Sequence, residues 1–124
     1  MNREIKFRVW DVENKEMLKV QELDFEPTFY DGRIAIRPDK YNDYFDTEDM
    51  ILMQYTGLHD KNGKEIYEGD IVNYENMTGK IIFLNASFIM SDFEETEEWE
   101  LGVINEEIEV IGNIYENSEL LEGE

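Results

Sequence analysis

The chain has 124 residues and no cysteine, and its 31 acidic and 11 basic side chains give a formal net charge of −20. A chain of this length can form one domain with a hydrophobic core, but without cysteine it can hold neither disulfides nor cysteine-based zinc sites. The surplus of carboxylates also argues against direct binding to nucleic acid or to an anionic membrane, because both carry the same sign of charge.

The sequence also lacks the apolar segments that direct a chain into a membrane. No apolar run approaches the ~20 residues that cross a bilayer. The first residues move straight into an alternating pattern without the apolar core of a signal peptide. We therefore expect a single soluble domain over residues 1–124, located in the cytoplasm.

The first predicted element is a strand over residues 5–11, where polar and apolar side chains alternate. A period of two places Ile5, Phe7 and Val9 on one face, which we expect to be buried. Turn-forming residues over 11–15 and a second apolar run then predict a β-hairpin.

Residues 21–49 give the weakest pattern of the chain. Residues 33–37 favour one short strand. The spacing of Tyr41, Tyr44 and Phe45 would suit one helical turn, whereas the asparagine and aspartates around them favour a loop. Both interpretations of this segment stay open from the sequence.

A sharper pattern begins at residues 50–55, whose apolar run predicts a buried strand that ends at Gly57. The Asn62-Gly63 pair that follows is typical of a type I′ hairpin turn, because both residue types tolerate a positive φ. We therefore expect a tight turn between this strand and the next.

A second turn is predicted over residues 68–70. We expect Gly69 to take a conformation that a Cβ would obstruct, and Asp70 to accept backbone hydrogen bonds. This turn opens a strand over 71–74, and a further turn at residues 78–79 leads into the next strand.

The remaining pattern predicts strands over residues 80–84 and 86–90, and a last strand over 108–115 with a bulge at Gly112. Asn117 is expected to cap a short terminal turn. Strands that recur about every 8–12 residues predict a mainly β fold with little helix, built of coiled antiparallel sheets with a barrel-like, SH3-like part.

Three motifs resemble the signatures of a known family. Residues 4–11 resemble the amino-terminal signature of the YopX family, residues 53–58 and 60–72 its central signature, and residues 108–117 and 119–121 its carboxy-terminal one. The resemblance implies bifurcated and coiled β-sheets and a gene carried by phages or prophages of Gram-positive bacteria. It implies no catalytic residues, because none are established for this family, whose function is unknown.

Candidate catalytic and metal-binding residues are few. His59 is the single histidine, and no nucleophile or orienting group stands at a fixed spacing from it. Residues 60–63 begin like a calcium loop, but the glycine is misplaced and the closing acid is absent. The pair of Glu68 and Asp70 lacks a third acid or a histidine at matching spacing. We therefore predict no enzymatic activity, no cofactor and no metal.

The strongest candidate for a functional surface is an acidic stretch over residues 92–100, within a second half (residues 63–124) that holds 17 acidic and 2 basic side chains. One interpretation is a solvated edge whose charges prevent edge-to-edge pairing. The other is an interaction patch for a basic protein surface, such as a DNA-binding groove of a host protein, with aromatic anchors and steering carboxylates. Its residues are Asp92, Glu94, Glu95, Glu97, Glu98, Trp99 and Glu100.

These observations favour a non-enzymatic phage accessory protein that binds a basic protein in the bacterial host. Two alternatives stay open: a ligand-binding or enzymatic module built on residues 53–72, and a virion or assembly component. The sequence also leaves homo-oligomer formation open.

Overall fold

A computed structural model describes residues 3–28 and 33–122 of the chain. The contacts between residues group into two compact units. We call Lys6–Gln54 the N-terminal unit, and Tyr55–Glu124 together with Met1–Ile5 the C-terminal unit. Each unit is described by itself.

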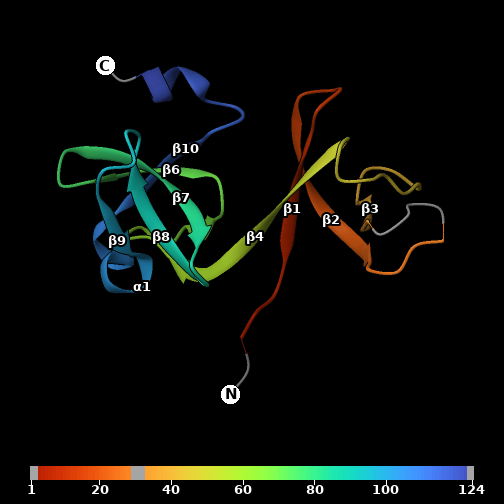
Figure 1. Ribbon diagram of the computed structural model, residues 1–124, viewed down its shortest axis with the longest axis horizontal. Helices are drawn as coiled ribbons and strands as arrows, with labels where there is room; N and C mark the ends of the chain where they lie inside the picture. Colours follow the sequence, from red (N-terminus) through yellow and green to blue (C-terminus); the bar gives the residue numbers. More distant parts are fainter. Residues whose placement is uncertain (1–2, 29–32, 123–124) are drawn as a thin grey trace. The chain divides into compact units, whose positions relative to one another are not determined.

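The N-terminal unit is an antiparallel sheet in which β1 lies between β2 and the first half of β4, with β3 beyond β2 (Figure 1). The predicted hairpin of the first two strands is confirmed, with Arg8 opposite Lys19 and Asp11 opposite Glu16. The strands are β1 (Phe7–Asp11), β2 (Glu16–Asp24), β3 (Ala35–Pro38) and β4 (Met50–His59).

The core of the N-terminal unit is small. Its fully enclosed members are Val9, Ile36 and Met50, with partly buried apolar side chains around them. The prediction that Ile5 faces the core was wrong, because Ile5 precedes β1 and is 61% exposed. Asp11 ends β1, as the strand predicted over residues 5–11 implies, and its buried carboxylate also accepts hydrogen bonds from the backbone N–H groups of the turn that follows.

The segment between β3 and β4 is a loop, which decides between the two interpretations of residues 41–45. Phe45 forms an isolated antiparallel bridge with Ile36, in which each backbone N–H donates to the other's carbonyl oxygen. The Tyr41 and Phe45 rings lie 5.5 Å apart. The spacing of the aromatic residues therefore reflects packing of this loop on the sheet and not a helical turn.

Strand β4 is longer than predicted. Gly57 does not end it: the residue has a φ of +88° and lies inside the strand. The pairing with β5 shifts register between Tyr55 and His59, which identifies a bulge at this point. Glycine adopts the positive φ without steric cost, so the strand bends here and continues.

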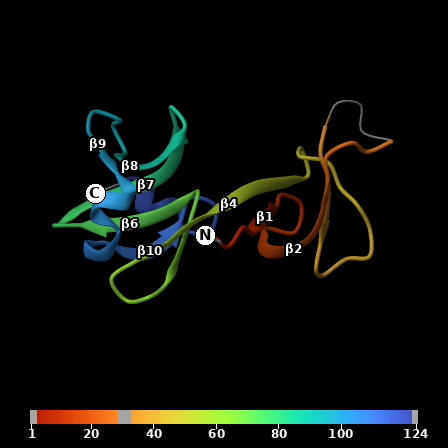
Figure 2. The same cartoon turned by 90° about the horizontal axis from the view of Figure 1, so that it is seen from below.

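The C-terminal unit is built on a second antiparallel sheet in the order β10-β6-β7-β8-β9, which Figure 2 shows from below. β5 pairs with the second half of β4. Among the described residues no pairing joins β9 to β10, so this sheet is not a closed barrel. The prediction of a mainly β fold of antiparallel sheets with little helix is confirmed. The elements are β5 (Glu65–Tyr67), β6 (Asp70–Tyr74), β7 (Met77–Leu84), β8 (Ser87–Asp92), β9 (Glu98–Glu100), α1 (Leu101–Ile104), η1 (Asn105–Glu107), β10 (Glu109–Asn113) and η2 (Ser118–Glu122).

One face of this second sheet carries the larger hydrophobic core of the chain. Residues on five strands, on α1 and directly before β10 enclose it, with Trp99 and Tyr74 packed at its side. The buried members are Ile66, Val72, Ile81, Met90, Leu101, Ile104, Ile108 and Val110. In the part of the chain that the structure describes, no helix is long and apolar enough to cross a bilayer.

Two turn predictions in the C-terminal unit were wrong, one in the type of turn and the other in its position. In the loop after β4, Gly63 has a φ of +84° but Asn62 does not have a positive φ, so the turn is not type I′. The turn between β6 and β7 is at Glu75 and Asn76, both with positive φ, and residues 78–79 lie inside β7.

Gly79 does not form a turn; it lies in β7, where it allows β8 to pack closely against this strand. A Cβ at this position would lie 2.5 Å from the backbone oxygen of Ser91 on β8. Close approach of the two strands therefore requires glycine, which explains why a residue type that usually marks turns stands in a strand.

The end of the chain follows the predictions more closely. β10 shifts register between Val110 and Gly112, which confirms a bulge at this point. The side-chain oxygen of Asn117 accepts a hydrogen bond from the backbone N–H of Asn113 at 3.0 Å. Asn117 also stands at the predicted cap position: it directly precedes η2, and its carbonyl oxygen accepts a hydrogen bond from the backbone N–H of Leu120 at 2.9 Å. Its side chain ties this turn back to β10.

Candidate functional site

The acidic stretch forms the end of β8, a loop and β9. We call residues 92–100 the acidic hairpin. β9 is an edge strand that pairs antiparallel with β8, with Trp99 opposite Met90 and Glu98 opposite Ser91. Because side chains alternate along a strand, Glu98 and Glu100 share the face opposite to that of Trp99.

Asp92 organises the loop of the acidic hairpin. Its side-chain oxygens accept hydrogen bonds from the backbone N–H and the hydroxyl of Thr96, at 2.7 and 2.6 Å, and from the backbone N–H of Glu97 at 3.1 Å. The Thr96 hydroxyl, followed by these N–H groups, lowers the pKa of the Asp92 carboxyl. This carboxylate therefore has a structural role.

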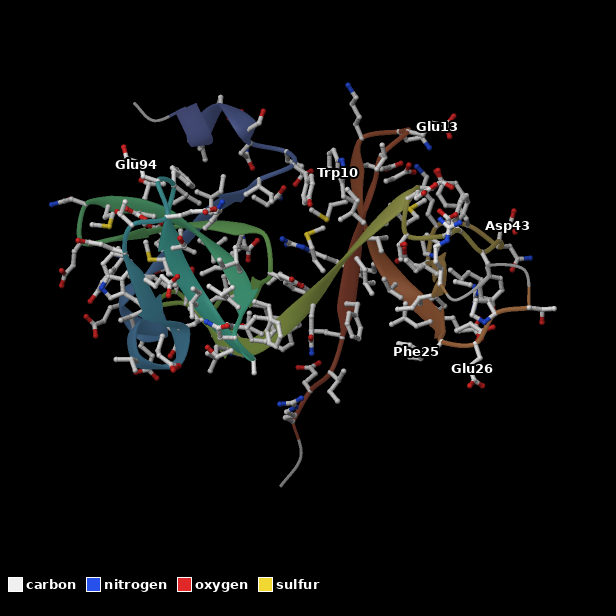
Figure 3. The ribbon with its side chains drawn as sticks, viewed as in Figure 1. Trp10, Glu13, Phe25, Glu26, Asp43 and Glu94 are labelled. Carbon is white, nitrogen blue, oxygen red and sulfur yellow. The ribbon has the colours of Figure 1, made fainter. Side chains whose placement is uncertain are left out.

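The five glutamates of the acidic hairpin are all exposed (Figure 3 labels Glu94 on the loop). Within the part of the chain that the structure describes, Lys80 on β7 forms an ion pair with one of them, Glu95, at 3.0 Å. Several like charges on one short hairpin with a single cation leave a strongly negative local potential. The set consists of Glu94, Glu95, Glu97, Glu98 and Glu100.

Trp99 has a different place from the one expected of an anchor for a partner. Its ring is half-buried against the core of the C-terminal unit and meets the Tyr74 ring edge-on at 5.9 Å. A shallow hollow of about 290 Å³ on the hairpin is lined partly by Trp99 together with Glu98 and Glu100. Most of the apolar surface of Trp99 therefore serves to fix β9 on the core.

Phe93 contributes to a feature that sequence reasoning did not single out. It lines a hollow of about 480 Å³ together with Met77, Ile111 and Leu120. These four apolar residues come from β7, the loop after β8, β10 and η2. The fold of the whole unit brings them together, so no local signal could have identified the hollow.

The central motif is held by a buried aspartate. One Asp60 side-chain oxygen accepts hydrogen bonds from the backbone N–H groups of Asn62 and Lys64, both at 2.9 Å, and the other from that of Val110 at 2.8 Å. Burial acts to raise the pKa of the Asp60 carboxyl, but the bonds from Val110, Lys64 and Asn62 outweigh it and lower the pKa. Asp60 therefore joins the loop after β4 to β10.

The other residues of the central motif also make structural contacts. The buried Asp70 accepts a hydrogen bond from the backbone N–H of Tyr67 at 2.7 Å, and Gly69 has a φ of +90°, which confirms both predictions for this turn. His59 is exposed, and its ring meets that of Tyr55 edge-on at 6.2 Å. Across residues 3–28 and 33–122, no three side chains of His, Cys, Asp or Glu are grouped to hold a metal ion.

A family model described as YopX protein matches residues 6–122. The chain belongs to the YopX protein family. This result confirms the resemblance that the three motifs suggested, and it covers both units described above.

Two solved structures share the fold. Protein EF1440 from Enterococcus faecalis is 28% identical, with 97% of this chain and 99% of that chain covered and a TM-score of 0.64. Protein yopX from Bacillus subtilis is 23% identical, with 96% and 97% covered and a TM-score of 0.66. A search of curated proteins gives no match. The likeness concerns the fold and brings no activity with it.

Proposed function

We propose that this protein is a non-enzymatic accessory protein of a phage or prophage that binds a basic protein in the host cytoplasm through the acidic hairpin. The proposal is supported by one observation above all: five exposed glutamates gather on the hairpin, and among the residues that the structure describes Lys80 pairs with one of them, Glu95. A basic partner would replace solvent as the counter-charge of this surface.

The physical contribution of such a surface lies mainly in the rate and specificity of association. Clustered carboxylates attract a basic surface over distances of about the Debye length, ~8–10 Å near physiological salt, and repel acidic partners. The expected signature is therefore a rate of association that falls steeply with ionic strength.

The test compares partner capture from a bacterial host lysate by the wild type and two variants with equal net charge. The hairpin variant carries glutamine at all five glutamates of the acidic hairpin. The control variant neutralises five exposed carboxylates elsewhere, and its positions are Glu26, Asp39, Asp43, Glu106 and Glu107.

We expect the hairpin variant to lose partners that the control variant keeps, and the association rate of a captured partner to lose most of its salt dependence. Since both variants lose the same number of charges, a difference between them reports the position of the charges. Identical partner sets for the wild type and the hairpin variant would contradict the proposal.

A further inference from the structure

We propose that the hollow beside the acidic hairpin receives a bulky apolar side chain of the partner, flanked in the partner's sequence by lysine or arginine. This inference rests on the proposed function and adds to it the chemistry of the recognised segment. The hollow measures about 480 Å³, and Met77, Phe93, Ile111 and Leu120 form its apolar part.

The position of Phe93 connects the hollow to the charged surface. Phe93 follows Asp92, the last residue of β8, and is followed at once by Glu94 and Glu95. The wall of the hollow is therefore continuous with the acidic hairpin. Glu119 adds a carboxylate to the lining itself. An apolar side chain in the hollow would thus place the neighbouring residues of its own chain beside carboxylates.

Ile111 is an exposed residue at the β-bulge of β10. Val110 lies opposite Val72 and Gly112 opposite Ile71, which leaves Ile111 as the extra residue of β10. Its side chain is 40% exposed and lines the hollow, whereas the preceding Val110 belongs to the core. Because side chains alternate along a strand, Ile111 points to the face opposite that of Val110. A large apolar side chain that is exposed on this face offers contact area to an occupant.

Charge complementarity selects the occupant. A second copy of this chain would bring another net charge of −20 to the acidic hairpin and Glu119 beside the hollow. Repulsion between like charges disfavours this arrangement. A segment with an apolar residue between lysines or arginines satisfies both parts of the surface. The apolar side chain loses water contact in the hollow, and the cations lie near the glutamates.

The test uses synthetic peptides with defined charge and apolar content. One peptide has a leucine flanked on both sides by lysines, and the second replaces the leucine by serine and keeps the lysines. Binding to the full chain is measured by calorimetry, and methyl NMR shifts of Met77 and Leu120 report whether the hollow is occupied.

We call substitutions of residues that line the hollow groove variants, and the first of them is Ile111→Ser. Its matched control is Val103→Ser. Val103 is an apolar residue of the same unit that is 75% exposed and does not line this hollow. Leu120→Ser on η2 is a second groove variant from another element, which keeps the test decisive if Ile111→Ser disturbs β10. Folding of each variant is checked by circular dichroism.

We expect the wild type and Val103→Ser to bind the leucine peptide about tenfold more tightly than the serine peptide, as expected for partial burial of one leucine side chain. Ile111→Ser and Leu120→Ser should remove this preference and leave the affinity for the serine peptide unchanged. Equal affinity of the wild type for both peptides would overturn the inference. A leucine preference that survives in both groove variants, or a dimer in the wild type that Ile111→Ser dissociates, would do the same.

The hairpin variant separates this inference from the function on which it rests. If the acidic hairpin steers the partner, neutralising its five glutamates should weaken both peptides equally and reduce the salt dependence, with the leucine preference retained. If that variant binds both peptides as the wild type does, the proposed function fails even where the groove variants show that the hollow binds leucine.

Discussion

The two units of this chain differ in how many of their surface carboxylates lie beside a cation. In the N-terminal unit, cations accompany the acids: Arg33 lies 3.2 Å from Glu48, Arg37 lies 2.9 Å from Glu22, and Lys40 pairs with Glu16. In the C-terminal unit, Lys80 pairs with Glu95 of the acidic hairpin at 3.0 Å, and the other four glutamates of that hairpin are also exposed. Several acids of the first unit thus lie beside a cation, whereas the acidic hairpin of the second gathers five exposed glutamates around one such pair.

This difference teaches that a count of acidic residues says little about their role. Exposed ion pairs contribute little to stability, about 0–1 kcal/mol each, and a cluster of like charges opposes folding. Since such a cluster does not stabilise the fold, its benefit lies in solubility or in the binding of a partner with the opposite charge. The comparison of the units therefore supports a binding role for the C-terminal acids more than total charge does.

The buried carboxylates, unlike the exposed ones, have the same role in both units. Asp11 accepts hydrogen bonds from the backbone N–H groups of Glu13 and Asn14 at 3.1 Å, as Asp60 does from Asn62 and Lys64. Both aspartates end a strand segment and hold the following turn. A buried aspartate that accepts backbone hydrogen bonds thus fixes a hairpin turn in each unit. The two units therefore differ in their exposed carboxylates and not in their buried ones.

The largest expected effect tests the difference in core size. Ile81→Ala removes a fully buried side chain from the larger core and should lower the free energy of unfolding by about 2–5 kcal/mol. Val9→Ala in the smaller core should cost about 2 kcal/mol, since fewer carbons are lost. Urea unfolding at neutral pH measures both. A larger loss for Val9→Ala would show that the smaller core carries more of the stability.

A smaller effect is expected at the aspartate shared by the loop after β4 and β10. Asp60→Asn places an amide where a carboxylate accepts three backbone N–H groups, so one donor loses its acceptor. The expected loss at neutral pH is about 1–3 kcal/mol. Asp11→Asn is the matching change in the N-terminal unit, and urea unfolding compares the two.

The same aspartates predict the pH dependence of stability. The pKa of Asp60 and that of Asp11 are both lowered in the folded chain, by backbone N–H donors at Asp60 and mainly by Asn14 at Asp11, which outweigh burial. The unfolded chain therefore binds more protons, and stability falls as pH drops below about 4. The difference between wild type and Asp60→Asn should shrink in this range. A difference that stays constant down to pH ~2 would contradict this account.

The smallest expected effect addresses the surface charges directly. Glutamine at Glu94, Glu97 and Glu98 should raise the thermal midpoint at low salt, because it relieves repulsion between like charges. The equal change at Glu16, Glu22 and Glu48 should lower it, because each of these carboxylates has a cation partner. Calorimetry at two salt concentrations checks both, and high salt should reduce both shifts. Shifts of the same sign would remove the contrast between the units.

Local patterns in the sequence determined much of the fold. The alternation over residues 5–11 predicted β1 and its hairpin, the apolar run at residues 50–55 predicted the first part of β4, and Gly69 with Asp70 predicted the turn before β6. The family motifs predicted membership that the family model confirms. These features are readable because strand alternation, positive φ and turn hydrogen bonds depend on neighbouring residues.

The tertiary structure alone decided the features that depend on distant neighbours. Gly57 continues a strand and Gly79 permits close approach to Ser91, although glycine alone suggests a turn in both places. Trp99 packs on the core, whereas Phe93 lines a hollow together with Ile111, although both aromatics lie in one acidic stretch. Such placements follow from which strands pair and in which register, and the register is a property of the whole sheet that no short segment of sequence contains.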